Sequence, residues 1–163
     1  MNNRTYKTGT YTLKNPEKFK GTKVPMYKSS FECRVFYWCD ENTKVLEWSY
    51  EPITIDYNFS LPTSAPDLDK SLVDNKSHKY YPDIVAVIKT NDSQTTNFLI
   101  EIKPYSQTIR PTEPKKKTKK SWNKYCNALQ EFLKNSVKWE AAEKYAKKNG
   151  MVFTVVTERQ IFT

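Results

Sequence analysis

The sequence predicts an α/β (α+β) domain in which helices alternate with groups of strands. Three patterns lead to this class: a short amphipathic helix, a pair of apolar strands joined by a polar turn, and a long helix followed by a last strand. The chain has 163 residues, the length of one domain. Only 37% of them are hydrophobic, but 14% are aromatic. Because each aromatic side chain buries a large area, a wholly disordered chain is excluded.

Residues 29–39 predict a helix, because serines at its start can cap it and apolar residues follow at spacings of three and four. Those apolar residues are Phe31, Val35, Trp38 and Cys39. Two strands are expected next, over residues 44–48 and 51–59, the second with alternating apolar and polar side chains. The polar, proline-containing residues 60–77 are expected to form a connecting loop.

The clearest pattern in the chain is a hairpin. Within residues 80–90, an almost continuous apolar strand follows Asp83. The polar turn 90–94 comes next, and then a second strand, 96–104, which ends at Pro104. On the second strand, Phe98, Ile100 and Ile102 share one face, and Leu99, Glu101 and Lys103 share the other.

A long helix is expected over residues 121–148, followed by a stop at Gly150 and a last apolar strand over 151–157. Its apolar stripe would comprise Trp122, Tyr125, Leu129, Phe132, Leu133, Val137, Ala141 and Tyr145. Residues 1–26 are polar and lack a periodic pattern, so they are expected to form an extended or poorly ordered arm. A single domain over 27–163 would follow this arm.

The positive charge is concentrated in one segment. The chain carries 27 Lys and Arg against 18 Asp and Glu, a formal charge of +9, and residues 110–120 alone hold six basic residues and one acid. Such a run cannot bury itself and predicts a mobile loop. Clustered cations displace counterions from nucleic acid, so the loop is interpreted as a DNA-binding arm; the alternative is a solvated loop that aids solubility. Its cations are Arg110, Lys115, Lys116, Lys117, Lys119 and Lys120.

Several classes of protein are disfavoured. No apolar run approaches the roughly 18 residues of a membrane span, and the polar start predicts no secretory signal. His78 is the single histidine, so Ser-His-Asp catalysis is not expected. The three cysteines, Cys33, Cys39 and Cys126, lack the CxxC spacing of zinc sites and are expected to be reduced thiols in a cytosolic protein.

Three charged residues of the hairpin form the candidate site. Asp83 starts the first strand and Glu101 lies in the second, so the turn can bring the two carboxylates side by side. Lys103 shares a face with Glu101, because residues two apart on a strand point the same way. Carboxylate oxygens suit Mg²⁺, and a neighbouring ammonium can stabilise a pentavalent phosphate or orient water. The set suits metal-assisted phosphodiester hydrolysis; the alternative is an exposed ion pair of little energetic value.

At these residues the sequence, YPDIVAV followed by FLIEIKP, resembles the PD-(D/E)xK nuclease superfamily, with Asp83, Glu101 and Lys103 on the motif positions. Flanking segments are similar to the head-completion nucleases of T4-like tailed phages, which are in turn similar to TnsA-type transposase endonucleases. These segments are residues 6–9, 15–16, 18–19, 27–32, 48–51, 138–142 and 153–158. The resemblance implies a restriction-endonuclease-like fold, a mixed sheet flanked by helices in αβββαβ order.

The resemblance also implies roles for the site residues. Asp83 and Glu101 would bind Mg²⁺, with Mn²⁺ as a substitute, and the backbone carbonyl of Ile102 would be a further ligand. Lys103 would position or activate the attacking water. Glu32, on the first helix, would face the same pocket as a metal ligand or a water-orienting acid; the alternative is a carboxylate on the helix surface.

Four further residues stand near this motif or on the long helix. Lys138 lies on the long helix, where the resemblance implies a polar residue directed toward the site; the alternatives are a solvated lysine on the helix surface and a phosphate contact. Tyr80 and Tyr81 precede Asp83, and one of them could stack on an exposed base or sugar. Glu51 could be an edge residue or a partner of the site, and the sequence leaves both interpretations open.

The function that the resemblance implies is a Mg²⁺-dependent DNA endonuclease that acts in phage head completion after DNA packaging. Its partners would be DNA and portal or neck proteins, and a homodimer would be one way to cut both strands. It would act in the host cytoplasm during assembly, and the virion is a further expected location. The alternative is a non-catalytic protein that binds DNA ends and closes the head. An RNA-binding module ranks third, because the sequence has no RNP-like or GxxG pattern.

Overall fold

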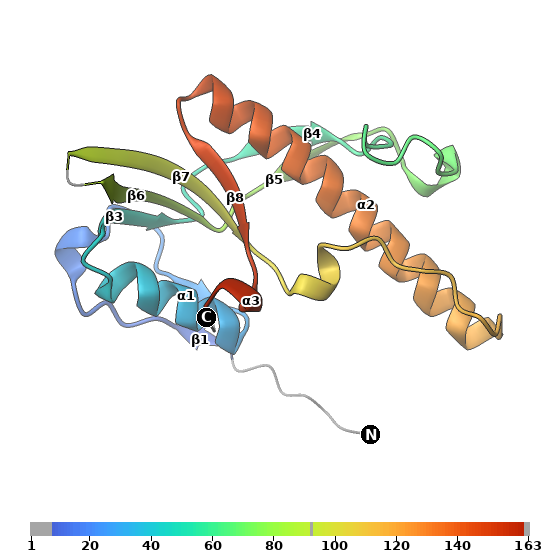
Figure 1. Cartoon of the computed structure of the whole chain (residues 1–163), viewed down its shortest axis with the longest axis horizontal. Helices are drawn as coiled ribbons and strands as arrows, with labels where there is room; N and C mark the ends of the chain where they lie inside the picture. Colours follow the sequence, from blue (N-terminus) through green and yellow to red (C-terminus); the bar gives the residue numbers. More distant parts are fainter. Residues whose placement is uncertain (1–7, 92, 162–163) are drawn as a thin grey trace.

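The computed structural model describes residues 8–91 and 93–161, and within them a four-stranded sheet lies between helices (Figure 1). Its strands are β3 (Val45–Tyr50), β6 (Ile84–Asn91), β7 (Gln94–Ile102) and β8 (Val152–Val156), in that order across the sheet. β3 and β7 run antiparallel to β6, and β8 runs parallel to β7. The mixed sheet, its flanking helices and the αβββαβ order that the sequence predicted are therefore confirmed.

The strand register brings several strand ends to one edge of the sheet. Tyr50, at the end of β3, and Ile100 of β7 both lie opposite Ile84, the first residue of β6. Ile102, at the end of β7, lies opposite Val156, at the end of β8. We call this edge, where β3, β7 and β8 end and β6 begins, the site edge.

Helix α1 (Ser30–Glu41) covers one face of the sheet (Figure 1). It begins where the Ser29 hydroxyl accepts a hydrogen bond from the Glu32 amide at 3.1 Å, which satisfies a free donor of the first turn. Its buried residues are Val35, Phe36, Cys39 and Asp40. Trp38, expected on the buried face, is 38% exposed, because the buried arc runs through Phe36 instead.

Helix α2 (Lys119–Lys148) crosses the opposite face, and its first half projects beyond the sheet (Figure 1). It begins two residues earlier than predicted, because Thr118 and Ser121 form a capping box. Lys119 and Lys120 therefore belong to the first turn of α2 rather than to the preceding loop. Gly150, with φ of 65°, follows the helix as predicted.

Two short strands form a ribbon that is separate from the central sheet. β4 (Ile55–Asn58) pairs antiparallel with β5 (Ser77–Tyr80). The strand predicted after Asp83 is confirmed as β6, which starts at Ile84, whereas Tyr80, at the start of the same apolar stretch, ends β5. Pro82 lies in the gap, and a proline cannot donate the backbone hydrogen bond that a continuous ladder requires.

The segment between β4 and β5, predicted as a polar loop, packs on the projecting half of α2. It includes the short helix η2 (Lys70–Leu72), and Ala65 is buried against Leu129 and Leu133. Trp122, expected in the apolar stripe, is 38% exposed, because this end of α2 lies beyond the sheet. Among the described residues, no helix is both long and apolar enough to cross a membrane.

Of the two states expected for the N-terminal segment, extended or poorly ordered, its described residues adopt the extended one and pack against the domain. β1 (Gly9–Thr10) pairs with β2 (Met26–Tyr27). Tyr11 is buried and donates a hydrogen bond to the buried Asp40 carboxylate at 3.1 Å. Because a buried carboxylate needs such donors, this contact ties the segment to α1. Residues 1–7 of the expected arm lie outside the described residues.

Candidate active site

The site edge brings together the three charged residues of the predicted motif. Asp83 lies one position before the Ile84–Ile100 pair, which places it beside Glu101 on the neighbouring strand. The Ile102 amide donates a hydrogen bond to Asp83 Oδ2 at 2.7 Å. Lys103 Nζ lies 3.0 Å from Glu101 Oε1. The hairpin therefore places the Asp83 carboxylate next to an ion pair between Glu101 and Lys103.

Glu101 is the most buried member of this cluster, with 2% of its surface exposed. Tyr80, the last residue of β5, donates its hydroxyl hydrogen to Glu101 Oε2 at 2.7 Å. Both carboxylate oxygens of Glu101 therefore have a donor, as burial of a charge requires. The sequence left open whether Tyr80 or Tyr81 could stack on a base. Tyr80 is 3% exposed and thus unsuited to that role, whereas Tyr81 is 44% exposed.

The cluster shifts the pKa values of its own members. Burial raises the pKa of Asp83 well above the usual aspartate value, and the negative charge of Glu101 raises it further. Burial alone would lower the pKa of Lys103, but the charges of Glu101 and Asp83 outweigh it, so the pKa of Lys103 is raised. Lys103 is therefore an ammonium at neutral pH, able to donate hydrogen bonds and unable to act as a base.

Lys138, on α2, lies over the ring of Tyr80, the residue that donates to Glu101. Its Nζ lies 5.4 Å from the centre of that ring, a cation–π distance. The pKa of Lys138 is lowered, chiefly by burial. The positive charge of Lys103 lowers it further, and the negative charge of Glu101 offsets part of the shift. Lys138 therefore interacts electrostatically with both members of the Glu101–Lys103 ion pair. It is half-buried rather than a free surface cation.

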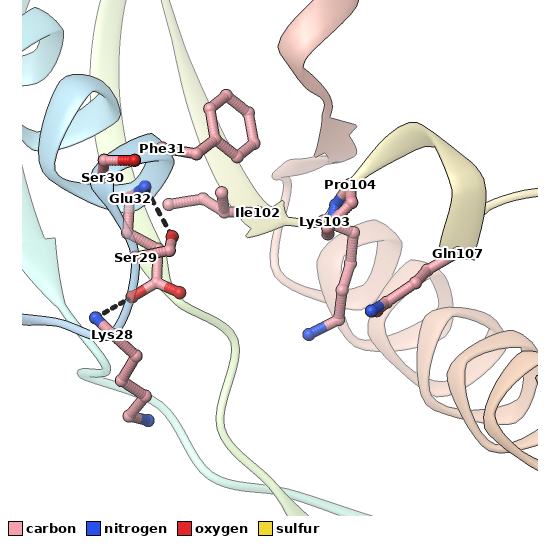
Figure 2. A pocket seen from close by; sticks show the side chains of 9 residues that line it. All are labelled: Lys28, Ser29, Ser30, Phe31, Glu32, Ile102, Lys103, Pro104 and Gln107. Atoms are coloured by element: carbon pink, nitrogen blue, oxygen red, sulfur yellow. Dashed lines mark hydrogen bonds between the residues drawn. The ribbon is translucent and has the colours of Figure 1, made fainter. Parts of the chain in front are cut away.

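A cavity of about 490 Å³ opens between the start of α1 and the end of β7 (Figure 2). Lys103 and Ile102 line it from β7, and Glu32 lines it from α1. Glu32 also accepts a hydrogen bond from the Lys28 amide at 2.7 Å, the dashed line at its carboxylate in Figure 2. Glu32 therefore faces the same cavity as Lys103 and at the same time closes the first turn of α1.

The oxygen donors of the site edge fit a hard divalent cation. Asp83 and Glu101 are like charges held side by side in a partly buried place, and a cation between them would relieve their repulsion. Across residues 8–91 and 93–161, no group of three or more His, Cys, Asp or Glu side chains is gathered as a metal site. A metal would therefore rely on these two carboxylates, on backbone oxygens such as the Ile102 carbonyl, and on water.

Glu51, for which the sequence left two interpretations open, is a neighbour of the site. Its amide donates to the Asp83 carbonyl at 2.9 Å. Its carboxylate accepts a hydrogen bond from the Tyr50 hydroxyl at 3.0 Å and pairs with Lys23 and Lys28. Of the two interpretations that the sequence left open, these contacts favour a partner of the site.

The basic loop lies beside the projecting half of α2 (Figure 1), and its cations are not equally free. Arg110 forms a bidentate ion pair with Asp67: its Nη2 donates to Oδ2 at 3.0 Å and its Nη1 donates to Oδ1 at 3.3 Å. Lys117 pairs with Glu113 at 2.8 Å and lies over the Trp122 ring. The remaining cations of the predicted arm, all exposed, are Lys115, Lys116, Lys119 and Lys120.

Comparison with known proteins adds an independent line of argument. The family model described as the TnsA-like endonuclease N-terminal domain matches residues 42–158. The matched region contains Asp83, Glu101 and Lys103, whereas Glu32 precedes it. The chain is also 30% identical over 152 residues to the head completion nuclease of Enterobacteria phage T4. The aligned region covers 93% of this chain and 91% of that protein.

Proposed function

The chain belongs to the TnsA-like endonuclease family, with a PD-(D/E)xK-type motif, and we propose that it is a Mg²⁺-dependent endonuclease that hydrolyses phosphodiester bonds in DNA. The observation that carries this proposal is the cluster of Asp83, Glu101 and Lys103 at the site edge. A fold has no need to bury two adjacent carboxylates, because burial of like charges costs stability. Such a cost is typical of catalytic sites.

Each residue of the cluster would have a distinct role. Asp83, Glu101 and the Ile102 carbonyl would hold Mg²⁺ or its substitute Mn²⁺. When bound, the metal supplies a positive charge that polarises the phosphate and lowers the pKa of water. Lys103, kept cationic by its carboxylate neighbours, would orient the attacking water and stabilise the extra negative charge on the phosphate. Glu32, which lines the same cavity, would bind the metal or orient water.

The DNA-binding surface would include the basic loop and Lys138. Lys115, Lys116, Lys119 and Lys120 are exposed and can contact phosphates without breaking a pair found in the structure. Lys138 lies next to the cluster and suits a phosphate close to the point of cleavage. Arg110 and Lys117 would first have to leave Asp67 and Glu113.

The similarity to a head completion nuclease supports the same role here. The protein would process the ends of packaged DNA in the host cytoplasm, in contact with portal or neck proteins, and could remain on the virion. One chain contains one Asp83–Glu101–Lys103 cluster, so cleavage of both strands would require a homodimer or two separate events.

Incubation with supercoiled plasmid tests the proposal. We expect nicked or linear plasmid with Mg²⁺ and none with EDTA. Asp83→Asn, which keeps the shape of the side chain, should be inactive, whereas Glu47→Gln, an exposed carboxylate of β3, should cleave like the wild type. Cleavage by Asp83→Asn at the wild-type rate would refute the assigned site.

A second candidate function, a non-catalytic protein that binds DNA ends and closes the head, is favoured by the exposed basic loop. It predicts retarded DNA in a mobility-shift assay and intact plasmid with either Mg²⁺ or Mn²⁺. Intact plasmid together with DNA binding would move the assignment to this function.

A further inference from the structure

Two lysines of the N-terminal segment converge on Glu51 at the site edge. Lys23 Nζ lies 3.5 Å from Glu51 Oε2, and Lys28 Nζ lies 3.6 Å from Glu51 Oε1. The lysine side chains are 50% and 72% exposed, whereas that of Glu51 is 20% exposed. Such exposed pairs add little to stability. One carboxylate shared by two ammonium groups leaves positive charge facing solvent.

Glu51 is held in an unusual backbone conformation, with φ of 41°. A non-glycine residue avoids this left-handed region unless its surroundings fix it there, and such residues concentrate at functional sites. Here the Glu51 amide is bound to the Asp83 carbonyl, and the Glu51 carboxylate is bound to the Tyr50 hydroxyl. Glu51 therefore links the backbone of the proposed metal ligand to the two lysines.

An exposed tyrosine completes this surface. Tyr81 lies two positions before Asp83, and Lys23 Nζ lies 5.2 Å from the centre of its ring. Tyr81 is 44% exposed, and Val24 and Met26 of the N-terminal segment are 61% and 55% exposed. A cation beside an accessible aromatic ring is the combination that binds a phosphate and its attached base or sugar.

The same surface continues into the cavity of the candidate active site. Lys28 lines the cavity together with Glu32 and Lys103. Figure 2 shows Lys28 on the α1 side of the cavity and Lys103 on the β7 side. The basic loop, by contrast, lies beside the half of α2 that projects beyond the sheet (Figure 1).

We propose that Lys23, Lys28 and Tyr81, here called the lysine–tyrosine rim, bind the DNA strand next to the phosphate that is cleaved. The two lysines contact backbone phosphates, and Tyr81 packs against a sugar or an unstacked base. Glu51 is a positioning residue that holds both lysines at a set distance from Asp83. The inference rests on the proposed nuclease function and adds a second DNA contact that the basic loop does not provide.

Binding measured without cleavage tests the rim. The probe is a fluorescent DNA duplex with single-stranded ends, titrated in EDTA at several salt concentrations. For the double variant Lys23→Gln/Lys28→Gln, the slope of log K against log salt should become shallower by about two units, close to 0.9 per phosphate contact. The matched control is Lys44→Gln/Lys89→Gln, two exposed lysines at the opposite edge of the sheet, which should keep the wild-type slope.

The tyrosine and the glutamate are tested by paired readouts. Tyr81→Leu should weaken binding about fivefold or more, whereas Tyr81→Phe keeps the ring and should bind like the wild type. Glu51→Gln should bind DNA at least as tightly as the wild type, because it removes a negative charge, yet cleave with a lower kcat. A role in folding alone would instead lower the melting temperature and reduce binding and kcat together.

The outcomes separate the rim from the nuclease assignment. A wild-type salt slope in Lys23→Gln/Lys28→Gln would overturn the rim even if the protein cleaves plasmid normally. A shallower slope would support the rim even if the plasmid stays intact, in which case only the nuclease assignment fails.

Discussion

The site edge and the projecting half of α2 both carry concentrated charge, but they hold it in different ways. At the site edge, Glu101 is 2% exposed and both of its oxygens have donors. Beside α2, the lysines are exposed, and the Arg110–Asp67 and Lys117–Glu113 pairs lie at the surface. Charges that neighbours hold in place keep the single geometry that chemistry needs. Exposed charges can adapt to a DNA backbone, which is sufficient for binding.

The largest difference between the two regions should appear when the same substitution is made in each. Lys103→Gln removes the ammonium that contacts Glu101 and should lower the rate of DNA cleavage about 10²–10³-fold. Lys119→Gln removes an exposed cation in the first turn of α2 and should change the rate less than about threefold. Single-turnover cleavage at saturating protein measures both, because it separates the chemical step from binding.

A conservative variant tells charge apart from shape at this position. Lys103→Arg keeps the positive charge but not the compact ammonium, and it should recover part of the lost rate. Equal rates for Lys103→Gln and Lys119→Gln would contradict the distinction between the two regions.

The basic region should dominate binding instead. Neutralising its four unpaired lysines should make the salt dependence of DNA affinity shallower by up to about four units, at close to 0.9 per phosphate contact. The cleavage rate at saturating protein should stay near the wild-type value, because the loop and the start of α2 lie beyond the sheet (Figure 1). The substituted residues are Lys115, Lys116, Lys119 and Lys120.

Four exposed lysines elsewhere provide the control for the change in net charge, and they should leave the salt dependence closer to that of the wild type. They are Lys89, Lys144, Lys147 and Lys148. An unchanged salt dependence in the loop variant would return the basic loop to its alternative role, a solvated segment that aids solubility.

The parts that could be predicted from the sequence are those set by neighbours along the chain. The alternation of β7 places Glu101 and Lys103 on one face, and the hairpin brings Asp83 beside them. The contacts of Tyr80 and Glu51 depend on where β5 and β3 end in space, which no local pattern encodes.

The same limit applies at the surface and in the N-terminal segment. Arg110 and Asp67 are 43 residues apart in the chain, and Tyr11 and Asp40 are 29 apart. Composition shows that a segment is basic or polar, but pairing over such distances decides which of its side chains are free. The sequence therefore indicated the chemistry of the candidate site better than the state of its surrounding charges.

A smaller effect is expected on stability at the site edge. Folding raises the pKa of Asp83 above its ordinary value of 3.8, so ionisation of Asp83 costs stability as the pH rises above that value. In EDTA at neutral pH, Asp83→Asn should therefore melt about 2–4 °C higher than the wild type. The difference should shrink as the pH falls toward 4, where the carboxyl of the unfolded chain is also protonated.

Addition of Mg²⁺ should reverse the order of the two melting temperatures, so that the wild type melts higher than Asp83→Asn. Mg²⁺ should raise the melting temperature of the wild type, because a ligand that binds only the folded state stabilises it. Asp83→Asn has lost one of the two carboxylates and should respond less. Equal responses of the two proteins would show that Asp83 does not bind the metal.

The smallest effect is expected at the Arg110–Asp67 pair, which tests whether pairing limits a cation in the basic loop. Asp67→Asn frees the guanidinium, so DNA affinity should rise about two- to threefold and the salt slope should steepen by about one unit. Asp69→Asn removes the same charge from the same segment but caps η2 instead of binding Arg110, so its slope should match the wild type. Equal slopes for both variants would mean that Arg110 braces the segment between β4 and β5 and does not reach DNA.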